Sequence, residues 1–329
     1  ARLYGLDNIP DTMPSAPSVS PLSDAPFRAK EKARSVMTSL GFFEAMHYSF
    51  LSQGELDAFD ARNAAERLPL PDPVSAEYGV LRDSLLPQLY QSLGRNASHQ
   101  LEEGKLFEIG RVFAKGPKES EKIALGFFGP VGRGALDRVK AVSPEEALLW
   151  MKGAVAELTR QLKVGKTDFR AAEHPAFAAA LEVVVNGRGV GVLGVVSDKL
   201  RHPFRLTTQM ALAELDLAPL LKRVDAVGKI APVPAYPMVV RDVAFVAGAD
   251  VTHEAVVKCI RKSAPKELTG VRIFDIFQSK ELGKGKRSLA YSLSFRSPDR
   301  TLTDDEVNGA FLRIVEALKG NLGVEVRDN

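Results

Sequence analysis

Three residues near the C-terminal end of the chain carry side chains suited to binding an unpaired nucleic-acid base. They are Asp275, Phe277 and Ser288. An aromatic ring can stack on a base, which contributes roughly 1–3 kcal/mol, and a carboxylate and a hydroxyl can hydrogen-bond to its edge. Because Asp275 and Phe277 are two positions apart, they point to the same face if the segment is a strand. The spacing therefore predicts a base-binding surface on one side of a β-sheet.

Basic residues gather around this segment, although the net charge of the whole chain is only +3. From residue 272 to residue 300 there are seven basic and three acidic residues, a local net charge of +4. Positive charge at this density attracts phosphates. The candidates for contacts with phosphates are Lys280, Lys284, Lys286, Arg287, Arg296 and Arg300.

Less specific explanations of the same residues stay open on the pattern alone. A Lys- and Gly-rich hairpin loop is more often simply solvated than bound to RNA. The ring of Phe277 could equally lie against another domain, and Asp275 could serve only to stabilise a neighbouring arginine. The pattern by itself favours a solvated loop over an RNA site.

The elements that must position these residues follow residue 232 in a clear order. The pattern predicts strands at 241–246, 271–277, 288–296 and 324–327, with one helix after the first strand and another after the third. Thr252 caps the first helix, and a capping box that begins at Thr303 opens the second. The order is βαββαβ, the split ferredoxin-like arrangement.

Strand periodicity assigns the two faces of that sheet. The apolar alternate residues of the third strand are Leu289, Tyr291, Leu293 and Phe295. They must pack under the helices, which leaves the small polar residues of this strand on the opposite, open side. In the second strand, alternation places Phe274 and Ile276 on the packed side. It places Asp275 and Phe277, together with Ile273, on the open side.

The preceding part of the chain predicts a second module, built on an antiparallel sheet. We expect a helix at 24–40, a strand at 42–51, a Pro-rich loop at 69–83 and a second helix from near Ser84. The remaining elements are a hairpin of 105–113 and 122–128, a helix from Ser143 to Leu162, a hairpin of 181–185 and 190–196, and a strand at 211–215. Hairpins with helices between them are typical of the α+β class.

Proline-rich stretches set the expected domain boundaries. Residues 1–10 are interpreted as the tail of a preceding domain whose body is missing, and 11–23, rich in proline and serine, as an extended linker. The α+β module then covers 24–228, and the ferredoxin-like domain covers 232–329.

Other chemistries find little support in the sequence. The five histidines lack metal-ligand spacing, and the single cysteine, Cys259, excludes an internal disulfide and fits a reducing cytoplasm. The glycines at 189, 191 and 194 match G-x-G-x-x-G but fall inside an expected strand, which predicts close strand packing and no nucleotide site. No apolar run reaches the ~20 residues needed to cross a bilayer. We expect no catalytic residue, metal or membrane partner.

Seven stretches of the chain are similar to a known family. They are Arg2–Pro10, Leu81–Pro87, Leu106–Phe113, Arg241–Phe245, Leu268–Phe277, Lys286–Tyr291 and Arg300–Val307. In family order they resemble bacterial phenylalanyl-tRNA synthetase beta subunits, and the last four resemble the ferredoxin-fold anticodon-binding domain of those subunits. The resemblance implies the C-terminal portion of such a subunit: a class II aminoacyl-tRNA synthetase-like module followed by the anticodon-binding domain.

The resemblance also implies a cytoplasmic α2β2 enzyme that joins phenylalanine to its tRNA with ATP and Mg2+. In that family the alpha subunit carries the active site, so this chain is expected to be non-catalytic and to hold no cofactor. Ala114-Lys115-Gly116 agrees, because it follows a strand where a working ATP-binding motif has Arg-x-Glu. The N-terminal tRNA-binding and editing modules of a full subunit are absent from this sequence, so hydrolysis of mischarged Tyr-tRNA is not expected.

The helix expected at 24–40 resembles the first class II motif, which builds the subunit interface. The resemblance therefore predicts that its apolar stripe packs against the alpha subunit. The residues of this stripe are Ala33, Val36, Met37 and Leu40. An ordinary helix of the chain's own core is the alternative.

By the same resemblance, Asp275 and Phe277 approach the first anticodon base and Ser288 lies nearby. Position 277 is Phe where the family commonly has Tyr, so stacking is kept and a hydroxyl contact is lost. A rival hypothesis is a free-standing ferredoxin-like regulatory or ligand-binding module attached to an inactive synthetase-like domain.

Overall fold

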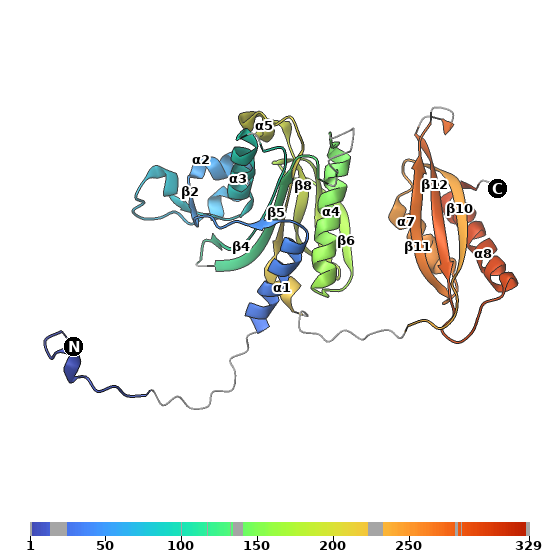
Figure 1. Ribbon diagram of the computed structural model, residues 1–329. Coiled ribbons are helices and arrows are strands. Elements are labelled where there is room, and N and C mark those ends of the chain that lie inside the picture. The colour runs from blue at the N-terminus through green and yellow to red at the C-terminus, as the bar shows by residue number, and fades with distance from the viewer. Residues whose placement is uncertain are drawn as a thin grey trace. The chain divides into compact units, whose positions relative to one another are not determined.

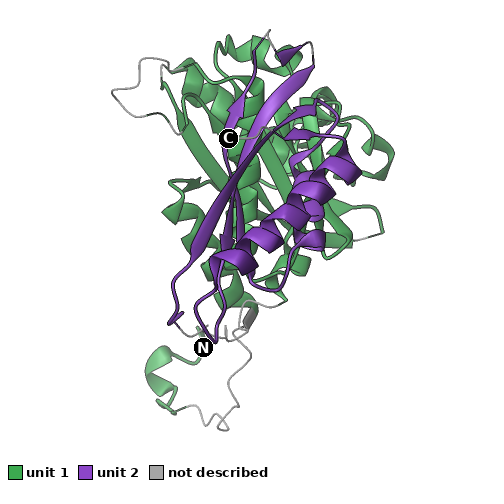
Figure 2. Ribbon diagram, turned by 90° about the vertical axis from the view of Figure 1, so that its right-hand side faces the viewer, with its two compact units in different colours: residues 1–227 green, residues 228–329 purple. Residues whose placement is uncertain are grey.

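The computed structural model describes residues 2–13, 25–99, 101–116, 118–131, 133, 141–222, 233–279, 282–283 and 285–326. The chain forms two compact units, residues 1–227 (unit 1) and residues 228–329 (unit 2), which Figure 2 colours separately. None of the helices in the described part of the chain combines the length and apolar character that crossing a bilayer requires.

Unit 1 is organised around a seven-stranded sheet. In spatial order its strands are β1 (Phe43–Glu44), β4 (Gly104–Ala114), β5 (Lys118–Phe128), β9 (Met210–Asp216), β8 (Arg188–Val196), β7 (Phe177–Val185) and β6 (Thr167–Ala172). Every neighbouring pair is antiparallel except β1 and β4, which run parallel. The antiparallel α+β module expected from the sequence is thus confirmed.

Helices cover both faces of this sheet, as Figure 1 shows. On one face lie α1 (Ala25–Ser39), α4 (Pro144–Gln161) and α6 (Leu217–Leu221), and on the other lies α3 (Leu86–Ser98). The capping box of Ser143 and Glu146 opens α4, as predicted. The shorter helices are α2 (Gln53–Phe59), α5 (Asp198–Arg201), and 3-10 turns at Leu6–Asn8, Ala64–Glu66, Ala76–Tyr78 and His202–Phe204.

The single strand predicted at 42–51 is wrong. The segment forms two short strands, because β1 pairs with β4 whereas β2 (Phe50–Leu51) pairs with β3 (Val80–Leu81). The change of partner interrupts the ladder. Helix α2 was not expected, although the capping box of Ser52 and Glu55 marks its start.

The glycines of β8 serve packing, as predicted. A Cβ atom at Gly191 would collide with the carbonyl oxygen of Glu214 on the neighbouring strand. A Cβ at Gly194 would collide with the ring of Phe177 on the other side. The close approach of three strands therefore accounts for both residues.

Unit 2 has the predicted βαββαβ order. Its elements are β10 (Val239–Gly248), α7 (His253–Ser263), β11 (Leu268–Phe277), β12 (Lys286–Phe295), α8 (Asp304–Leu322) and β13 (Glu325–Val326). The four strands lie in the order β11-β12-β10-β13, all antiparallel. Thr252 and Thr303 cap the two helices. Both helices pack on the same face of the sheet, against residues that include Phe245, Leu289 and Tyr291.

Candidate nucleic-acid interface

The strand register of unit 2 brings Asp275, Phe277 and Ser288 to one face of the sheet. Phe277 lies directly opposite Ser288, and Asp275 lies opposite Ala290. Leu289, the residue between Ser288 and Ala290, is buried under the helices. Because neighbouring residues of a strand point to opposite faces, the three candidates lie on the face away from the helices. We call this the open face.

A β-bulge in β11 produces this arrangement. Ile273 pairs with Tyr291 and Asp275 pairs with Ala290, so Phe274 is an extra residue at a register shift. The prediction that Phe274 belongs to the core is wrong, because its side chain is 50% exposed. Ile273 is the residue that packs against the core, and it does not share the open side. The bulge reverses the alternation, so Asp275 and Phe277 still reach the open face.

Phe277 and Asp275 offer complementary contacts to a flat aromatic ligand, whereas Ser288 is nearly buried between the strands. The ring of Phe277 is 52% exposed. Asp275 is exposed and makes no hydrogen bond or ion pair with the described residues, so both carboxylate oxygens can accept hydrogen bonds. Ser288 is only 8% exposed and lies between Phe277 and Val246 in the two flanking strands. A base could therefore stack on the ring while its edge meets a carboxylate.

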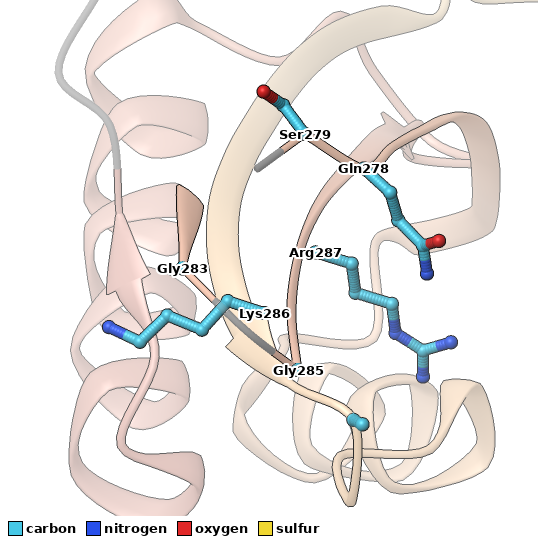
Figure 3. A pocket seen from close by; sticks show the side chains of 7 residues that line it. Gln278, Ser279, Gly283, Gly285, Lys286 and Arg287 are labelled. Carbon is cyan, nitrogen blue, oxygen red and sulfur yellow. The ribbon is translucent and has the colours of Figure 1, made fainter. Parts of the chain in front are cut away.

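The basic candidates do not converge on this site. Lys286 belongs to the open face but pairs with Glu325, with 3.0 Å between Nζ and Oε1. Arg287 points to the other face, as Figure 3 shows, and its Nη2 donates to the carbonyl of Val251 at 2.8 Å. Arg287 therefore lies on the face opposite the base site, and its contact with a phosphate stays a prediction. Lys280 and Lys284 lie outside the described residues.

The two remaining arginines are distant or engaged. Arg296 lies eight positions along β12 from Ser288, which corresponds to about 27 Å. Arg300 donates through Nη1 to Oε2 of Glu306 at 2.8 Å.

A cavity of about 560 Å³ opens beside Arg287, with Ala249, Gln278, Ser279, Gly283, Gly285 and Lys286 as its other lining residues (Figure 3).

The apolar stripe of α1 faces the chain's own core. Ala33, Val36 and Met37 are at most 5% exposed and pack in the main core of unit 1, and Leu40 packs against the same core. The prediction that Ala33, Val36 and Met37 meet another subunit is therefore wrong, whereas for the half-buried Leu40 it stays a prediction. Local periodicity shows that a face is apolar, but it cannot show which protein covers that face.

Sequence reasoning missed an exposed apolar surface beside β1 and β2. Its members are Met46 (92% exposed), Tyr48 (74%), Phe50 (37%) and Tyr78 (41%), and we call them the aromatic edge. All four line a groove of about 1010 Å³. Exposed aromatic and methionine side chains in one patch are typical of protein-protein interfaces.

A buried polar network lies behind this groove. Oε2 of Glu108 is hydrogen-bonded to Nδ1 of His47 at 2.6 Å, and Oε1 of Glu108 accepts from Nη1 of Arg82 at 2.8 Å. Gln88 accepts from Arg82 at 3.1 Å and donates to the carbonyl of Tyr48 at 2.6 Å. Burial raises the pKa of Glu108, but the hydrogen bond with His47 and the charge of Arg82 lower it by more, so it lies below its ordinary value. No cluster of three or more His, Cys, Asp or Glu suited to a metal occurs among the described residues.

Comparison with known proteins decides the family. Residues 9–217 match the family model described as the phenylalanyl tRNA synthetase beta chain CLM domain. The chain belongs to the phenylalanyl-tRNA synthetase beta chain family. Residues 234–327 match the family model described as the ferredoxin-fold anticodon binding domain. Asp275, Phe277 and Ser288 all lie within this second match.

Curated relatives in this beta chain family match along almost the whole sequence. The phenylalanine–tRNA ligase beta subunit of Clostridium tetani is 30% identical over 99% of this chain, and that of Geobacillus kaustophilus is 32% identical over 99%. The chain spans 41% of the length of each. Among solved structures, the chain is similar to a pyrrolysyl tRNA synthetase from Desulfitobacterium hafniense, with a TM-score of 0.49, 15% identity, and coverage of 60% of this chain and 66% of that chain.

Proposed function

We propose that this chain is the C-terminal portion of a phenylalanine–tRNA ligase beta subunit and that unit 2 binds the anticodon of tRNA-Phe on its open face. The observation that supports this most directly is the register of β11 and β12. It sets an exposed ring opposite a serine and beside a carboxylate that has no partner among the described residues. Stacking holds the base, and the carboxylate accepts from its edge.

In this proposal the chemistry of aminoacylation belongs to the alpha subunit of a cytoplasmic α2β2 enzyme, which uses ATP and Mg2+. This chain supplies structure and RNA binding and no catalytic residue. Two carboxylates on the sheet of unit 1 have partners inside the unit and stabilise its fold. Glu108 is paired with Arg82, and Glu214 accepts from Lys122 at 2.6 Å and from the backbone N–H of Leu85 at 2.6 Å. The rival, a free-standing regulatory or ligand-binding module, fits poorly with beta-subunit relatives that match over 99% of the chain.

Replacing Phe277 by Ala is expected to weaken binding of the full chain to a tRNA-Phe anticodon stem-loop by about 1–3 kcal/mol, because the stacking platform is removed. Phe277→Tyr keeps the ring and should retain the affinity. Fluorescence anisotropy of a labelled stem-loop measures both. Leu312→Ala is the matched control, since Leu312 is 60% exposed and lies on α8, which packs on the other face. Equal affinity of wild type and Phe277→Ala would remove Phe277 from the site.

We also propose that the aromatic edge, in place of the α1 stripe, meets the alpha subunit. Tyr48→Asp is expected to abolish co-purification with a co-expressed alpha subunit, because a charge cannot be buried in an apolar contact without a partner. The urea unfolding of unit 1 should stay unchanged, since Tyr48 is 74% exposed. Val74→Asp, at a fully exposed position, is the control. Retention of the alpha subunit by Tyr48→Asp would contradict this surface.

A further inference from the structure

We propose that Arg272 contacts a phosphate of the RNA strand whose base stacks on Phe277, so that the open face holds at least two nucleotides. This inference rests on the anticodon-binding function proposed above and extends its site along β11. Sequence reasoning did not select Arg272 as a phosphate contact. Arg272 is a candidate because the strand register places it on the open face and because the other described basic residues are paired, distant or on the other face.

The register places Arg272 on the same face as Phe277. Arg272 lies opposite Ser292, and Phe277 lies opposite Ser288. Four positions along β12 correspond to about 14 Å, and both serines point away from the helices. The bulge at Phe274 lies between Arg272 and Phe277, and without it the two side chains would point to opposite faces.

Arg272 is also available for a ligand. Its side chain is exposed and makes no hydrogen bond or ion pair with the described residues. By contrast, Lys286 is paired with Glu325 and Arg300 with Glu306. Arg287 points to the helix side, and Arg296 is about twice as far from Ser288 along β12 as Arg272 is from Phe277. Among the described basic residues of 272–300, Arg272 therefore combines the correct face with a free guanidinium.

The charges across the sheet define the course of the RNA strand. Asp242 on β10 lies on the other side of Ser292 from Arg272, two strand spacings or about 10 Å away. It repels phosphate, whereas Arg272 attracts it. Asp275 also repels phosphate, and it lies on β11 between Arg272 and Phe277, where its carboxylate faces the base edge. The phosphate is therefore held at the Arg272 end of β11, and only small side chains, Ala290 and Ser292, lie on β12 beside that path.

The test is the salt dependence of stem-loop binding by the full chain. One phosphate contact to a single strand contributes about 0.7 to the slope of log K against log salt concentration. Arg272→Gln should therefore reduce the slope by about 0.7 and weaken binding about four-fold at 0.15 M salt, with no difference near 1 M. Arg272→Lys should keep the slope. Lys262→Gln, an exposed cation of α7, should leave it unchanged.

Phe277→Ala should weaken binding without changing the slope, because an uncharged ring contributes to affinity but not to the salt dependence. An unchanged slope in Arg272→Gln, together with weaker binding by Phe277→Ala, would overturn the role of Arg272 and leave anticodon binding intact. Failure of the wild-type chain to distinguish the tRNA-Phe stem-loop from an unrelated hairpin would overturn both.

The contacted phosphate can then be located chemically. Stem-loops that carry one uncharged methylphosphonate linkage, placed in turn along the loop, should include one that lowers the wild-type slope by the same amount. Arg272→Gln should add no further loss on that stem-loop. Additive losses at every position would mean that Arg272 contacts no single phosphate, and the proposal would fall.

Discussion

Glu108→Gln is expected to lower the free energy of unfolding of unit 1 by about 3–5 kcal/mol, the effect of breaking a buried ion pair by removing one partner. The side chains of Glu108 and Arg82 are 3% and 4% exposed. Glutamine keeps the shape but leaves the guanidinium of Arg82 buried without an opposite charge. Urea unfolding followed by tryptophan fluorescence isolates unit 1, because Trp150 is the single tryptophan of the chain and packs against the unit 1 core.

An exposed pair provides the control for Glu108→Gln. Glu119 and Arg111 are 53% and 63% exposed and lie 3.3 Å apart on the hairpin of β4 and β5. Glu119→Gln should therefore change the unfolding free energy by at most about 1 kcal/mol. Comparable losses in the two variants would show that burial does not distinguish them.

The loss of stability in Glu108→Gln is expected to depend on pH. The pKa of Glu108 is lowered in the folded chain, so its contribution to stability is present above the unfolded-state pKa of about 4.3 and is lost as pH falls through the folded value. The difference in stability between wild type and Glu108→Gln should therefore be largest near neutral pH and shrink in acid. A difference that grows in acid would contradict the lowered pKa.

Met37→Ala is expected to destabilise unit 1 by about 2–5 kcal/mol in the absence of any other subunit, because the Met37 side chain is fully buried in the core. Trp150 fluorescence in urea reports the loss. Phe27→Ala, a truncation on the same helix at a side chain 63% exposed, is the matched control. Unchanged stability in Met37→Ala, combined with lost binding of an alpha subunit, would restore the interface role of α1.

Local sequence was sufficient for most of unit 2. The alternation of apolar residues from Leu289 to Phe295 defines β12 and its packed face, and the capping residues Thr252 and Thr303 mark the helix starts. Each of these signals lies within a few residues of the element that it predicts. The βαββαβ order follows directly from them.

The predictions from local sequence are wrong where the structure of a segment depends on residues far away in the chain. The bulge at Phe274 is set by how β11 pairs with β12, and the burial of Met37 is set by the sheet that α1 packs on. The network around Glu108 joins His47, Arg82 and Gln88, and His47 is 61 residues from Glu108 in the chain. Neither a short motif nor periodicity within one element contains this information.

The bulge in β11 makes the proposed RNA surface sensitive to chain length. Deleting one residue between Ile273 and Asp275 would restore simple alternation. The side chains either at the end of β11 or at its beginning would then point to the opposite face of the sheet. In the first case the ring and the acid would face the helices, and in the second the arginine would. Arg272, Asp275 and Phe277 would all remain in such a protein, yet they could no longer meet on one surface. Relatives aligned across a one-residue gap here therefore cannot share this surface, even where these three residues are identical.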